Sequence, residues 1–521
     1  VTGTMQQTES DLTRGVLFTD HYQLTMSQLY FREGLHEKRV RFDHYFREYP
    51  DYGTHQAGYC INAGMGSLQE WMNSVSFDRQ VLDVLAQQRD VDGKALFDDG
   101  FLQYLHQMGG FEGLSITAIP EGRVVHPHES LTVVEGPLIK AQLLETVLLA
   151  TLNYQTLIAT RAARIKFSGR DQLMLDFGMR RGHAFGANAG TRAALIGGAD
   201  YSSNVGVSQQ MGLPARGTHA HSMVQVYMAL GMGEFDAFRA YAKAYPNQCL
   251  LLVDTVDTLG SGVPNAIRVF EELRASGYEP VGVRLDSGDL AYLSIQVANL
   301  LDAAGFSQAG IALSNNLDEI SIWQIVTQIQ HEAGRYGQDA SKLLKRLSFG
   351  VGTRLMTSEG ASALGGVYKL VAVEDGSQWK SAIKLSESAV KTPSPGQKRV
   401  YRLYDSQGSA SVDVIAEQDE GFDGREANQL FHPTHPGSSR RVKAGEMVEQ
   451  EELLQPVAES SLPPGEALQQ MRERRDKDIS RLHPGVLRLV NPHIYHVSLS
   501  ESLHQSKQRL VEDLKRGRDE R

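Results

Sequence analysis

Short apolar runs that end in polar residues recur through the middle of the chain. Between residues 245 and 355 their spacing of roughly 30 residues is typical of successive βα units. The runs are Leu173–Phe177, Leu213–Gly217, Cys249–Asp254, Val281–Asp286, Gly310–Asn316 and Leu347–Thr353. From residue 245 to 355 the intervening segments carry apolar residues at three- and four-residue spacing, as helices with one buried face do. The pattern predicts parallel strands that alternate with helices.

Polar groups follow each of the last four runs. They are Asp254-Thr255-Val256-Asp257, Arg284 to Asp289, Ser314-Asn315-Asn316 and Gly350-Val351-Gly352-Thr353. In a β/α barrel the carboxyl ends of all strands face one mouth, where these groups would converge. A turn with a helix cap explains each end alone, but it explains the four together poorly. A barrel with a site at this mouth is therefore the better interpretation.

The parts on either side of this region follow other patterns. A helix is expected over Tyr22–Glu33 and a strand over Val40–Phe46, and residues 113–140 contain further strand-like runs. Two hairpins are predicted to turn at Asp375-Gly376 and at Ser406-Gln407-Gly408. The tail, Ser506–Arg521, reads as a solvated helix or a frayed end.

These patterns divide the chain into three parts. We expect an N-terminal α+β domain (1–150), a β/α barrel with the active site (151–358), and C-terminal hairpins with a polar helical extension (359–521). The hairpins are expected to pack back on the N-terminal domain.

Composition narrows the class of protein. The chain has 521 residues, 41% hydrophobic and 22% charged, which is ordinary for a globular protein. Its 52 basic and 62 acidic residues give a net charge of −10, so nucleic acid is not an expected partner. Two cysteines exclude a disulfide framework and a cysteine zinc cluster. Without an apolar run of about 20 residues, we expect no membrane association and a cytoplasmic protein.

The segment Val283-Arg284-Leu285-Asp286-Ser287-Gly288-Asp289 carries the strongest signal for a site. A helix N-cap explains Asp286 or Asp289 alone. It does not explain Arg284, which lies within an apolar run and needs a buried partner. A strand that ends in a ligand site accounts for all of these residues.

Two histidines, His219 and His221, follow a short apolar run and begin a helical stretch. A metal pair would need further ligands, which the sequence does not supply at suitable spacing. A hydrogen-bonded core histidine is the usual case for either residue alone. A histidine that accepts a phosphoryl group or acts as an acid–base is the third alternative, and spacing does not choose among them.

Gly350, Gly352 and the pair Arg180-Arg181 stand at other strand ends. Glycines let backbone N–H groups approach a phosphate, and arginines bind pyrophosphate or carboxylate through forked hydrogen bonds. Each signal is weak alone, because glycines also form plain turns and paired arginines are often solvated. The chain contains no P-loop motif.

Together these segments resemble nicotinate phosphoribosyltransferase, a family of type II phosphoribosyltransferases. The matching segments, from Thr19 to about Arg402, are Thr19 to Met26, Tyr45-Phe46-Arg47, Glu121-Gly122, Leu144-Glu145-Thr146, Ala159 to Arg164, Arg180-Arg181, Ser203-Asn204, Gly217 to His221, Asp254-Thr255, Val283 to Leu290, Ser314-Asn315, Gly350 to Thr353 and Val367 to Leu370. The resemblance implies an α/β fold with an incomplete, irregular β/α barrel joined to an N-terminal domain. It also implies a homodimer with active sites near the subunit interface.

The resemblance implies transfer of phosphoribose from phosphoribosyl pyrophosphate to nicotinate, coupled to ATP, giving nicotinate mononucleotide and pyrophosphate for NAD salvage. Arg284 matches the arginine that binds the nicotinate carboxylate, and Tyr22 matches an aromatic that stacks on the pyridine ring, from either subunit. Phe177 stands where related nicotinamide enzymes have a stacking aromatic. Gly352 and Thr353 resemble the cradle of the 5′-phosphate.

Further roles follow from the same resemblance. Asp254 and Asp286 look like carboxylates near the ribose hydroxyls or Mg²⁺, which usually takes few protein carboxylates. Arg180 would hold pyrophosphate or phosphate, and Thr218 and Ser314 are assigned to substrate binding. The resemblance selects His221, and not His219, as the histidine that ATP phosphorylates.

Some positions depart from the family pattern, and two other functions stay open. His21 stands where an apolar residue is usual, the segment 182–188 is less typical, and little after Glu420 can be matched. A nicotinamide phosphoribosyltransferase would need a carboxylate acceptor for the amide, and Asp200 lies near that place. A catalytically silent relative is the other alternative, against which the intact set Tyr22, His221, Arg284 and Thr353 argues.

Overall fold

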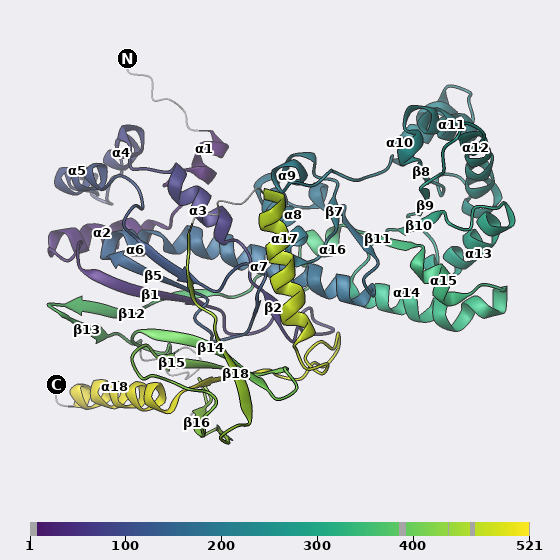
Figure 1. Ribbon diagram of the computed structural model, residues 1–521. Helices are drawn as coiled ribbons and strands as arrows, with labels where there is room; N and C mark the ends of the chain where they lie inside the picture. The colour runs from purple at the N-terminus through teal and green to yellow at the C-terminus, as the bar shows by residue number, and fades with distance from the viewer. Residues whose placement is uncertain (1–7, 385–391, 436, 459–463, 520–521) are drawn as a thin grey trace, which may run out of the picture. The chain divides into compact units, whose positions relative to one another are not determined.

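The computed structural model describes residues 8–384, 392–435, 437–458 and 464–519 (Figure 1). The chain forms two compact units. Unit 1 comprises residues 1–157, 363–461 and 473–521, and unit 2 comprises 158–362 and 462–472. Two of the boundaries between the units fall within helices, α7 (Glu145–Ser168) and α17 (Pro464–Ser480).

Unit 2 is built on a six-stranded parallel sheet that curls into a half-barrel. Its strand order is β7-β6-β11-β10-β9-β8, so β7 and β8 form the two edges. The strands are β6 (Leu173–Asp176), β7 (Tyr201–Ser202), β8 (Leu250–Leu252), β9 (Gly282–Leu285), β10 (Gly310–Leu313) and β11 (Leu347–Val351). Since the strands are parallel, all their carboxyl ends lie along one rim, as the sequence pattern predicts.

Helices connect these strands, and caps fix where several of them begin. The Asp289 carboxylate accepts the N–H groups of Ala291 and Tyr292 at the start of α13, and Asp318 caps α14 in the same way. The helices are α8 (Ala184–Gly197), α9 (Val205–Gln210), α10 (His221–Ala229), α11 (Glu234–Ala244), α12 (Val263–Ala275), α13 (Leu290–Ala303), α14 (Glu319–Glu332), α15 (Ala340–Lys345) and α16 (Thr353–Met356). Helices α11 to α14 lie side by side in order, α12 to α14 each burying an apolar face.

Buried arginines stabilise the centre of unit 2. The guanidiniums of Arg161 and Arg164, on α7, each lie 3.1 Å from the Glu319 carboxylate, and all three side chains are buried. Losing Glu319 would remove the carboxylate that both buried guanidiniums share, and breaking a buried ion pair costs about 3–5 kcal/mol. These two arginines of the resemblance therefore have a structural role.

Unit 1 contains two six-stranded sheets. The first has the order β13-β12-β1-β5-β3-β19, and the second β17-β16-β20-β15-β14-β18. The strands of the first sheet and the pair β2–β4 are β1 (Arg39–Tyr45), β2 (Cys60–Ile61), β3 (Ser115–Ala118), β4 (Val124–Val125), β5 (Thr132–Pro137), β12 (Val367–Asp375), β13 (Gln378–Ser381) and β19 (Gln455–Pro456). Strand β12 pairs antiparallel with β1, so the chain after the half-barrel returns to the N-terminal sheet.

The second sheet and the remaining helices complete unit 1. The strands are β14 (Lys398–Asp405), β15 (Ala410–Glu417), β16 (Asn428–Phe431), β17 (Ser439–Val442), β18 (Met447–Glu452) and β20 (His496–Leu499). The helices are α1 (Glu9–Arg14), α2 (His21–Arg32), α3 (Met65–Ser74), α4 (Arg79–Ala86), α5 (Asp99–Met108), α6 (Leu138–Leu143) and α18 (Glu501–Asp519). The main apolar core lies between the first sheet and α2 to α6, and includes Val40, Leu68, Phe101 and Val134.

The structure confirms most of the elements predicted from sequence, including both hairpins. The strand predicted at Leu213–Gly217 is wrong, because this segment is a loop and β7 takes the edge position beside β6. Pro214 lacks the N–H group that a paired strand donates, which accounts for the error. No helix within the described ranges is long and apolar enough to cross a membrane.

Candidate active site

Arg284 lies on the rim of unit 2, on β9, the strand next to the edge strand β8. Strand β9 places it in register with Leu252 of β8 and Ala312 of β10. Its Nε donates to Ser314 Oγ at 2.8 Å, Nη1 to Thr218 Oγ1 at 3.3 Å and Nη2 to Asp286 Oδ1 at 3.1 Å. The buried partners expected for Arg284 are therefore two hydroxyl groups and one carboxylate. Asp286 also accepts from the Ser314 hydroxyl.

Phe177 packs against the same guanidinium. Its ring centroid lies 5.1 Å from Cζ of Arg284, within reach of a cation–π interaction. Gly350, on β11, leaves the space that the ring occupies, since a Cβ there would lie 2.5 Å from two ring carbons. A glycine at position 350 is thus required for Phe177 to support Arg284.

His221 begins α10 and faces two carboxylates. Its Nδ1 shares a hydrogen bond of 3.0 Å with Thr255 Oγ1. This contact turns the ring so that Nε2 lies 3.9 Å from Asp254 Oδ1 and 3.9 Å from Asp286 Oδ2. The side chain is 37% exposed, so the ring is accessible to solvent.

Asp254 presents a free carboxylate oxygen at this place. Its Oδ2 accepts the N–H of Asp286 at 3.0 Å and the Ser287 hydroxyl at 2.6 Å. Its Oδ1 is buried and has no hydrogen-bond partner among the described residues. A free buried oxygen beside a second carboxylate fits a hard cation such as Mg²⁺, which takes one or two protein carboxylates and completes its shell with phosphate and water.

His219 has a structural role that separates it from His221. Its Nε2 accepts the N–H of Leu252 at 3.1 Å, which fixes the end of β8. Burial lowers the pKa of His219 to about 4, so the ring is neutral at physiological pH. Since Nε2 is already an acceptor, a His-x-His metal pair is excluded.

The loops after β6 and β11 form the other side of the rim. The Asp176 carboxylate accepts the N–H of Gly178 at 2.8 Å and the hydroxyls of Thr191 and Ser202, and its burial raises its pKa. These bonds shape the turn that carries Phe177 and the exposed Arg180. After β11 the backbone turns at Gly352, with φ −121° and ψ −103°, into the short helix that begins at Thr353. The first N–H groups of a helix lack intrahelical acceptors and are available to an anion.

The structure brings seven predicted residues together by direct contacts. They are Thr218, His221, Asp254, Asp286, Arg284, Ser314 and Phe177. Gly352, Thr353 and Arg180 lie at strand ends of the same half-barrel, whereas Tyr22 belongs to α2 of unit 1 and is 46% exposed.

Sequence reasoning missed the positioning roles of three residues: Thr255 and Asp176 were given none, and Gly350 was assigned to phosphate approach, whereas it makes room for the Phe177 ring. Each stands in or directly after an apolar run, in a segment already singled out from the sequence. Their roles depend on contacts with segments far along the chain, which spacing does not reveal.

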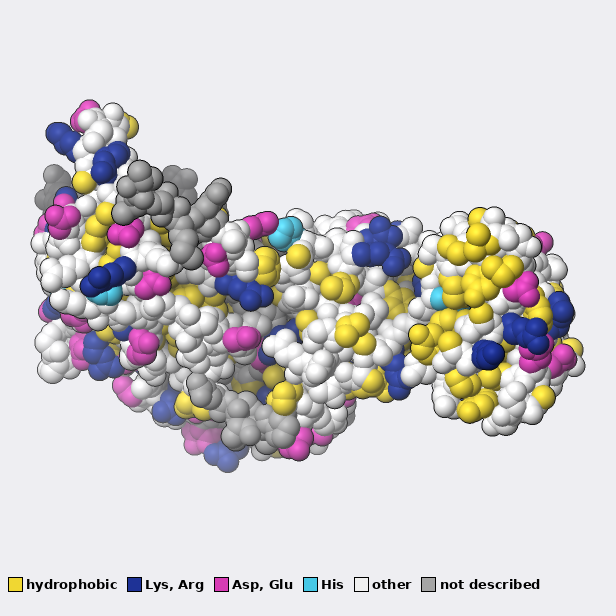
Figure 2. All heavy atoms as spheres, turned by 90° about the horizontal axis from the view of Figure 1, so that it is seen from above, with side chains coloured by type: hydrophobic (Ala, Val, Ile, Leu, Met, Phe, Trp, Pro, Cys, Tyr) yellow, Lys and Arg dark blue, Asp and Glu magenta, His cyan; other side chains and the backbone are white. Residues whose placement is uncertain are grey.

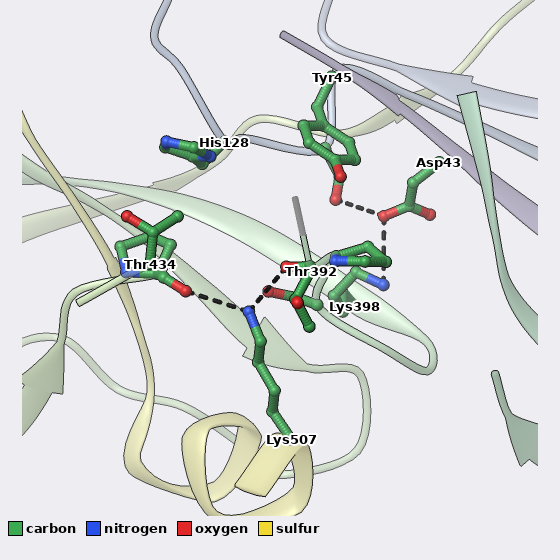
Figure 3. Close-up of a pocket in the computed structure, with 11 residues that line it drawn as sticks. Asp43, Tyr45, His128, Thr392, Lys398, Thr434 and Lys507 are labelled. Atoms are coloured by element: carbon green, nitrogen blue, oxygen red, sulfur yellow. Dashed lines mark hydrogen bonds and ion pairs between the residues drawn. The ribbon is translucent and has the colours of Figure 1, made fainter. Parts of the chain in front are cut away.

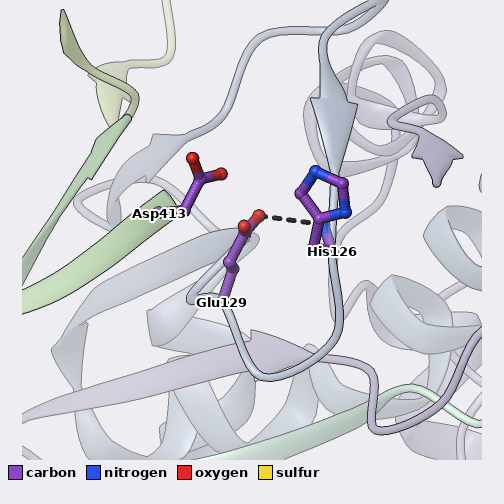
Figure 4. A group of neighbouring side chains, drawn as sticks. All are labelled: His126, Glu129 and Asp413. Atoms are coloured by element: carbon purple, nitrogen blue, oxygen red, sulfur yellow. Dashed lines mark hydrogen bonds between the residues drawn. The ribbon is translucent and has the colours of Figure 1, made fainter. Parts of the chain in front are cut away.

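A second cluster of possible metal ligands lies in unit 1, where His126, Glu129 and Asp413 approach one another (Figure 4). Arg402 and Tyr495 already donate to the Asp413 oxygens, at 2.6–3.2 Å. Burial and the charge of Asp413 raise the pKa of Glu129 well above its usual range, so Glu129 is protonated. These contacts leave Asp413 few lone pairs for a cation, and we assign the cluster to the core.

Three family models cover nearly the whole chain. The N-terminal domain of nicotinate phosphoribosyltransferase matches residues 17–153, the main family domain 173–400 and the C-terminal domain 397–507. The chain belongs to the nicotinate phosphoribosyltransferase family. The last match corrects the expectation that little after Glu420 can be assigned, because the C-terminal domain of this family extends to residue 507.

Relatives that match this chain over nearly its whole length support the same family assignment. The nicotinate phosphoribosyltransferase of Bacillus subtilis is 37% identical over 501 residues, 96% of each chain. That of Dictyostelium discoideum is 33% identical and covers 94% of this chain and 86% of its own length. The crystal structure of human nicotinic acid phosphoribosyltransferase has a TM-score of 0.76 and 29% identity, and covers 94% of this chain and 99% of the human one.

Proposed function

We propose that this member of the nicotinate phosphoribosyltransferase family transfers phosphoribose from phosphoribosyl pyrophosphate to nicotinate, with ATP hydrolysis driving the reaction. The products are nicotinate mononucleotide and pyrophosphate, and the pathway is NAD salvage. One observation carries the proposal. A guanidinium and a carboxylate at the end of β9, a carboxylate after β8 and a histidine at the start of α10 meet at the rim of the half-barrel.

Arg284 is proposed to bind the nicotinate carboxylate. Its planar fork suits a carboxylate, and the hydroxyls of Ser314 and Thr218 hold the guanidinium in place. Phe177, and Tyr22 of either subunit, would stack on the pyridine ring.

Nicotinamide is the less favoured substrate. Its amide would need a carboxylate acceptor, and Asp200 is the candidate. The Asp200 Oδ2 already accepts from Lys166 Nζ at 2.8 Å and from the N–H of Met174 at 2.7 Å. Met174 lies near the amino end of β6, so these contacts hold Asp200 at the end of the strand opposite the carboxyl-end rim, which favours nicotinate.

The transfer needs little covalent chemistry from the protein. The ring nitrogen of nicotinate attacks C1 of the ribose while pyrophosphate leaves, through a transition state with oxocarbenium character. Gly352 and Thr353 would bind the 5′-phosphate, and Arg180 the pyrophosphate. Asp254 and Asp286 would hold Mg²⁺, which neutralises charge on the leaving pyrophosphate.

His221 is proposed to couple ATP to the transfer. ATP would phosphorylate the ring, and hydrolysis of the phosphohistidine would drive the reaction forward. Support comes from its partial exposure and from the fixed orientation that Thr255 gives it.

The coupling test compares His221→Gln with a matched variant, His219→Gln. We expect His221→Gln to lose ATP stimulation and acid-labile phosphate incorporation while it retains ATP-independent transfer. His219→Gln should retain ATP stimulation, since its role is structural. Undiminished stimulation in His221→Gln would refute the coupling role and leave the transferase assignment intact.

A homodimer is proposed on an observation in unit 2. Exposed apolar residues gather on α10 and the turn that follows, namely Val226, Met228, Leu230 and Met232. Figure 2 shows hydrophobic side chains gathered over this end of unit 2 (right). A contiguous apolar surface is typical of a protein interface.

The cytoplasmic location of the protein stays a prediction.

A further inference from the structure

A small pocket in unit 1 is lined by two lysines that the proposed reaction does not use (Figure 3). It lies among β1, the segment before β5, the start of β14 and helix α18. Its volume is about 20 Å³, enough for about one water-sized group. Side chains that line it include Asp43, Tyr45, His128, Lys398, Thr434 and Lys507.

The two ammonium groups have unequal partners. Lys398, with a side chain 2% exposed, lies 3.1 Å from Asp43 Oδ2. Lys507, on α18, donates to the backbone carbonyls of Thr392 and Pro433, both at 3.0 Å. Asp43 is the one carboxylate among the described residues that line the pocket, so Lys507 faces carbonyl dipoles and no counter-charge there.

The charged side chains that lower the pKa values of Lys507 and His128 are those of basic residues. Burial and the charge of Lys398 lower the pKa of Lys507 to about 8. Burial lowers the pKa of His128 to about 4, and the neighbours that lower it further include Lys507 and Arg47. A half-buried ammonium without a counter-charge is costly, and an anion in the pocket would offset that cost.

We propose that this pocket binds a small oxyanion, a phosphate or carboxylate group of which one terminal oxygen lies between Lys507 and Lys398. The Tyr45 hydroxyl points into the same space (Figure 3) and adds a third donor. Two ammoniums and a hydroxyl are donors suited to such an oxyanion. The small volume limits the buried part of the ligand to one terminal oxygen, with the remainder at the opening. The site lies wholly in unit 1 and does not depend on the chemistry proposed for unit 2.

Amine labelling reports directly on Lys507. The full-length protein is acetylated briefly at pH 8 in chloride, inorganic phosphate or acetate at equal ionic strength, and peptides are quantified by mass spectrometry. If the anion restores the pKa of Lys507 from about 8 to 10.5, the neutral fraction of the amine at pH 8 falls from about one half to about 0.3%. The rate of acetylation would then fall by at most about 150-fold. We expect Lys507 to be acetylated at least ten times more slowly than in chloride when the salt supplies the oxyanion that binds. Slowing in phosphate would indicate a phosphate site, and slowing in acetate a carboxylate site.

Lys515, exposed on the same helix, provides the matched control. Its labelling should be equal in all three salts. In thermal melts, Lys515→Met should retain the saturable stabilisation by phosphate or acetate, and Lys507→Met should lose the part due to this pocket. Equal labelling of Lys507 in all salts overturns the proposal, as does full oxyanion stabilisation of Lys507→Met. The labelling experiment uses the wild-type protein, so it decides the matter even where a variant folds poorly.

Discussion

Gly350→Ala tests whether the packing beneath Arg284 controls the site. A Cβ at position 350 would lie 2.5 Å from two carbons of the Phe177 ring, whereas carbon contacts are ordinarily about 3.5–4.0 Å. The ring must therefore move by about 1 Å, and Arg284 lies against it. A displacement of about 1 Å in a catalytic site costs on the order of 100-fold in rate. Overpacking should also lower the free energy of unfolding by about 1–3 kcal/mol.

The assay is kcat/KM for nicotinate together with a chemical denaturation curve. Gly186→Ala is the matched control, because a Cβ there meets nothing within 4 Å, and it should be neutral or slightly stabilising. Phe177→Ala should relieve the clash, so the double variant should unfold less readily than additivity predicts. Wild-type kcat/KM in Gly350→Ala, or strict additivity with Phe177→Ala, would refute the reasoning.

Three further predictions concern single contacts. Thr255→Val removes one hydrogen bond to His221, worth about 0.5–1.5 kcal/mol, so phosphate incorporation should slow by roughly 2- to 13-fold, and Thr255→Ser should restore it. Asp254→Asn should raise the Mg²⁺ concentration for half-maximal activity about tenfold or more, which a magnesium titration would show; an unchanged value would place the ion elsewhere. Burial lowers the pKa of His126 from its ordinary value of 6.5 to about 3. Between pH 6.5 and pH 3 this histidine therefore binds fewer protons in the folded protein than in the unfolded chain. The stability that the neutral ring contributes is complete above pH 6.5 and is lost as the pH falls toward 3, by about 2 kcal/mol at pH 5.0. His126→Gln should flatten this dependence in denaturation curves, and an equal slope would contradict it.

The half-barrel could be predicted because its signal is local. Apolar runs such as Val281–Asp286 and Gly310–Asn316 repeat with helical segments between them, and parallel strands place their polar ends on one rim. The strand prediction at Leu213–Gly217 was wrong because it relied on hydrophobicity and gave too little weight to Pro214, which has no N–H group to donate to a neighbouring strand. The edge strand β7, only two residues long, leaves no periodic pattern to read.

The sequence indicated which residues gather at the candidate site, but not the contacts that they make. Arg284 stood out because a charge within an apolar run requires a partner, and the structure supplies Asp286 and Ser314. Spacing left His219 and His221 equivalent, and the hydrogen bond from Leu252 to His219 now separates their roles. The Thr255 contact with His221 spans 34 residues, a pairing that only the folded sheet creates.

Arg284→Gln, assayed on nicotinate and on nicotinamide, tests most directly whether this rim recognises an aromatic acid. A charged hydrogen bond to the carboxylate is worth about 1.5–3 kcal/mol, so kcat/KM for nicotinate should fall by about 10- to 150-fold. Nicotinamide lacks the carboxylate, and its kcat/KM should change far less, so the preference for nicotinate should collapse. An equal fall on both substrates, or an unchanged preference, would show that Arg284 does not bind the carboxylate.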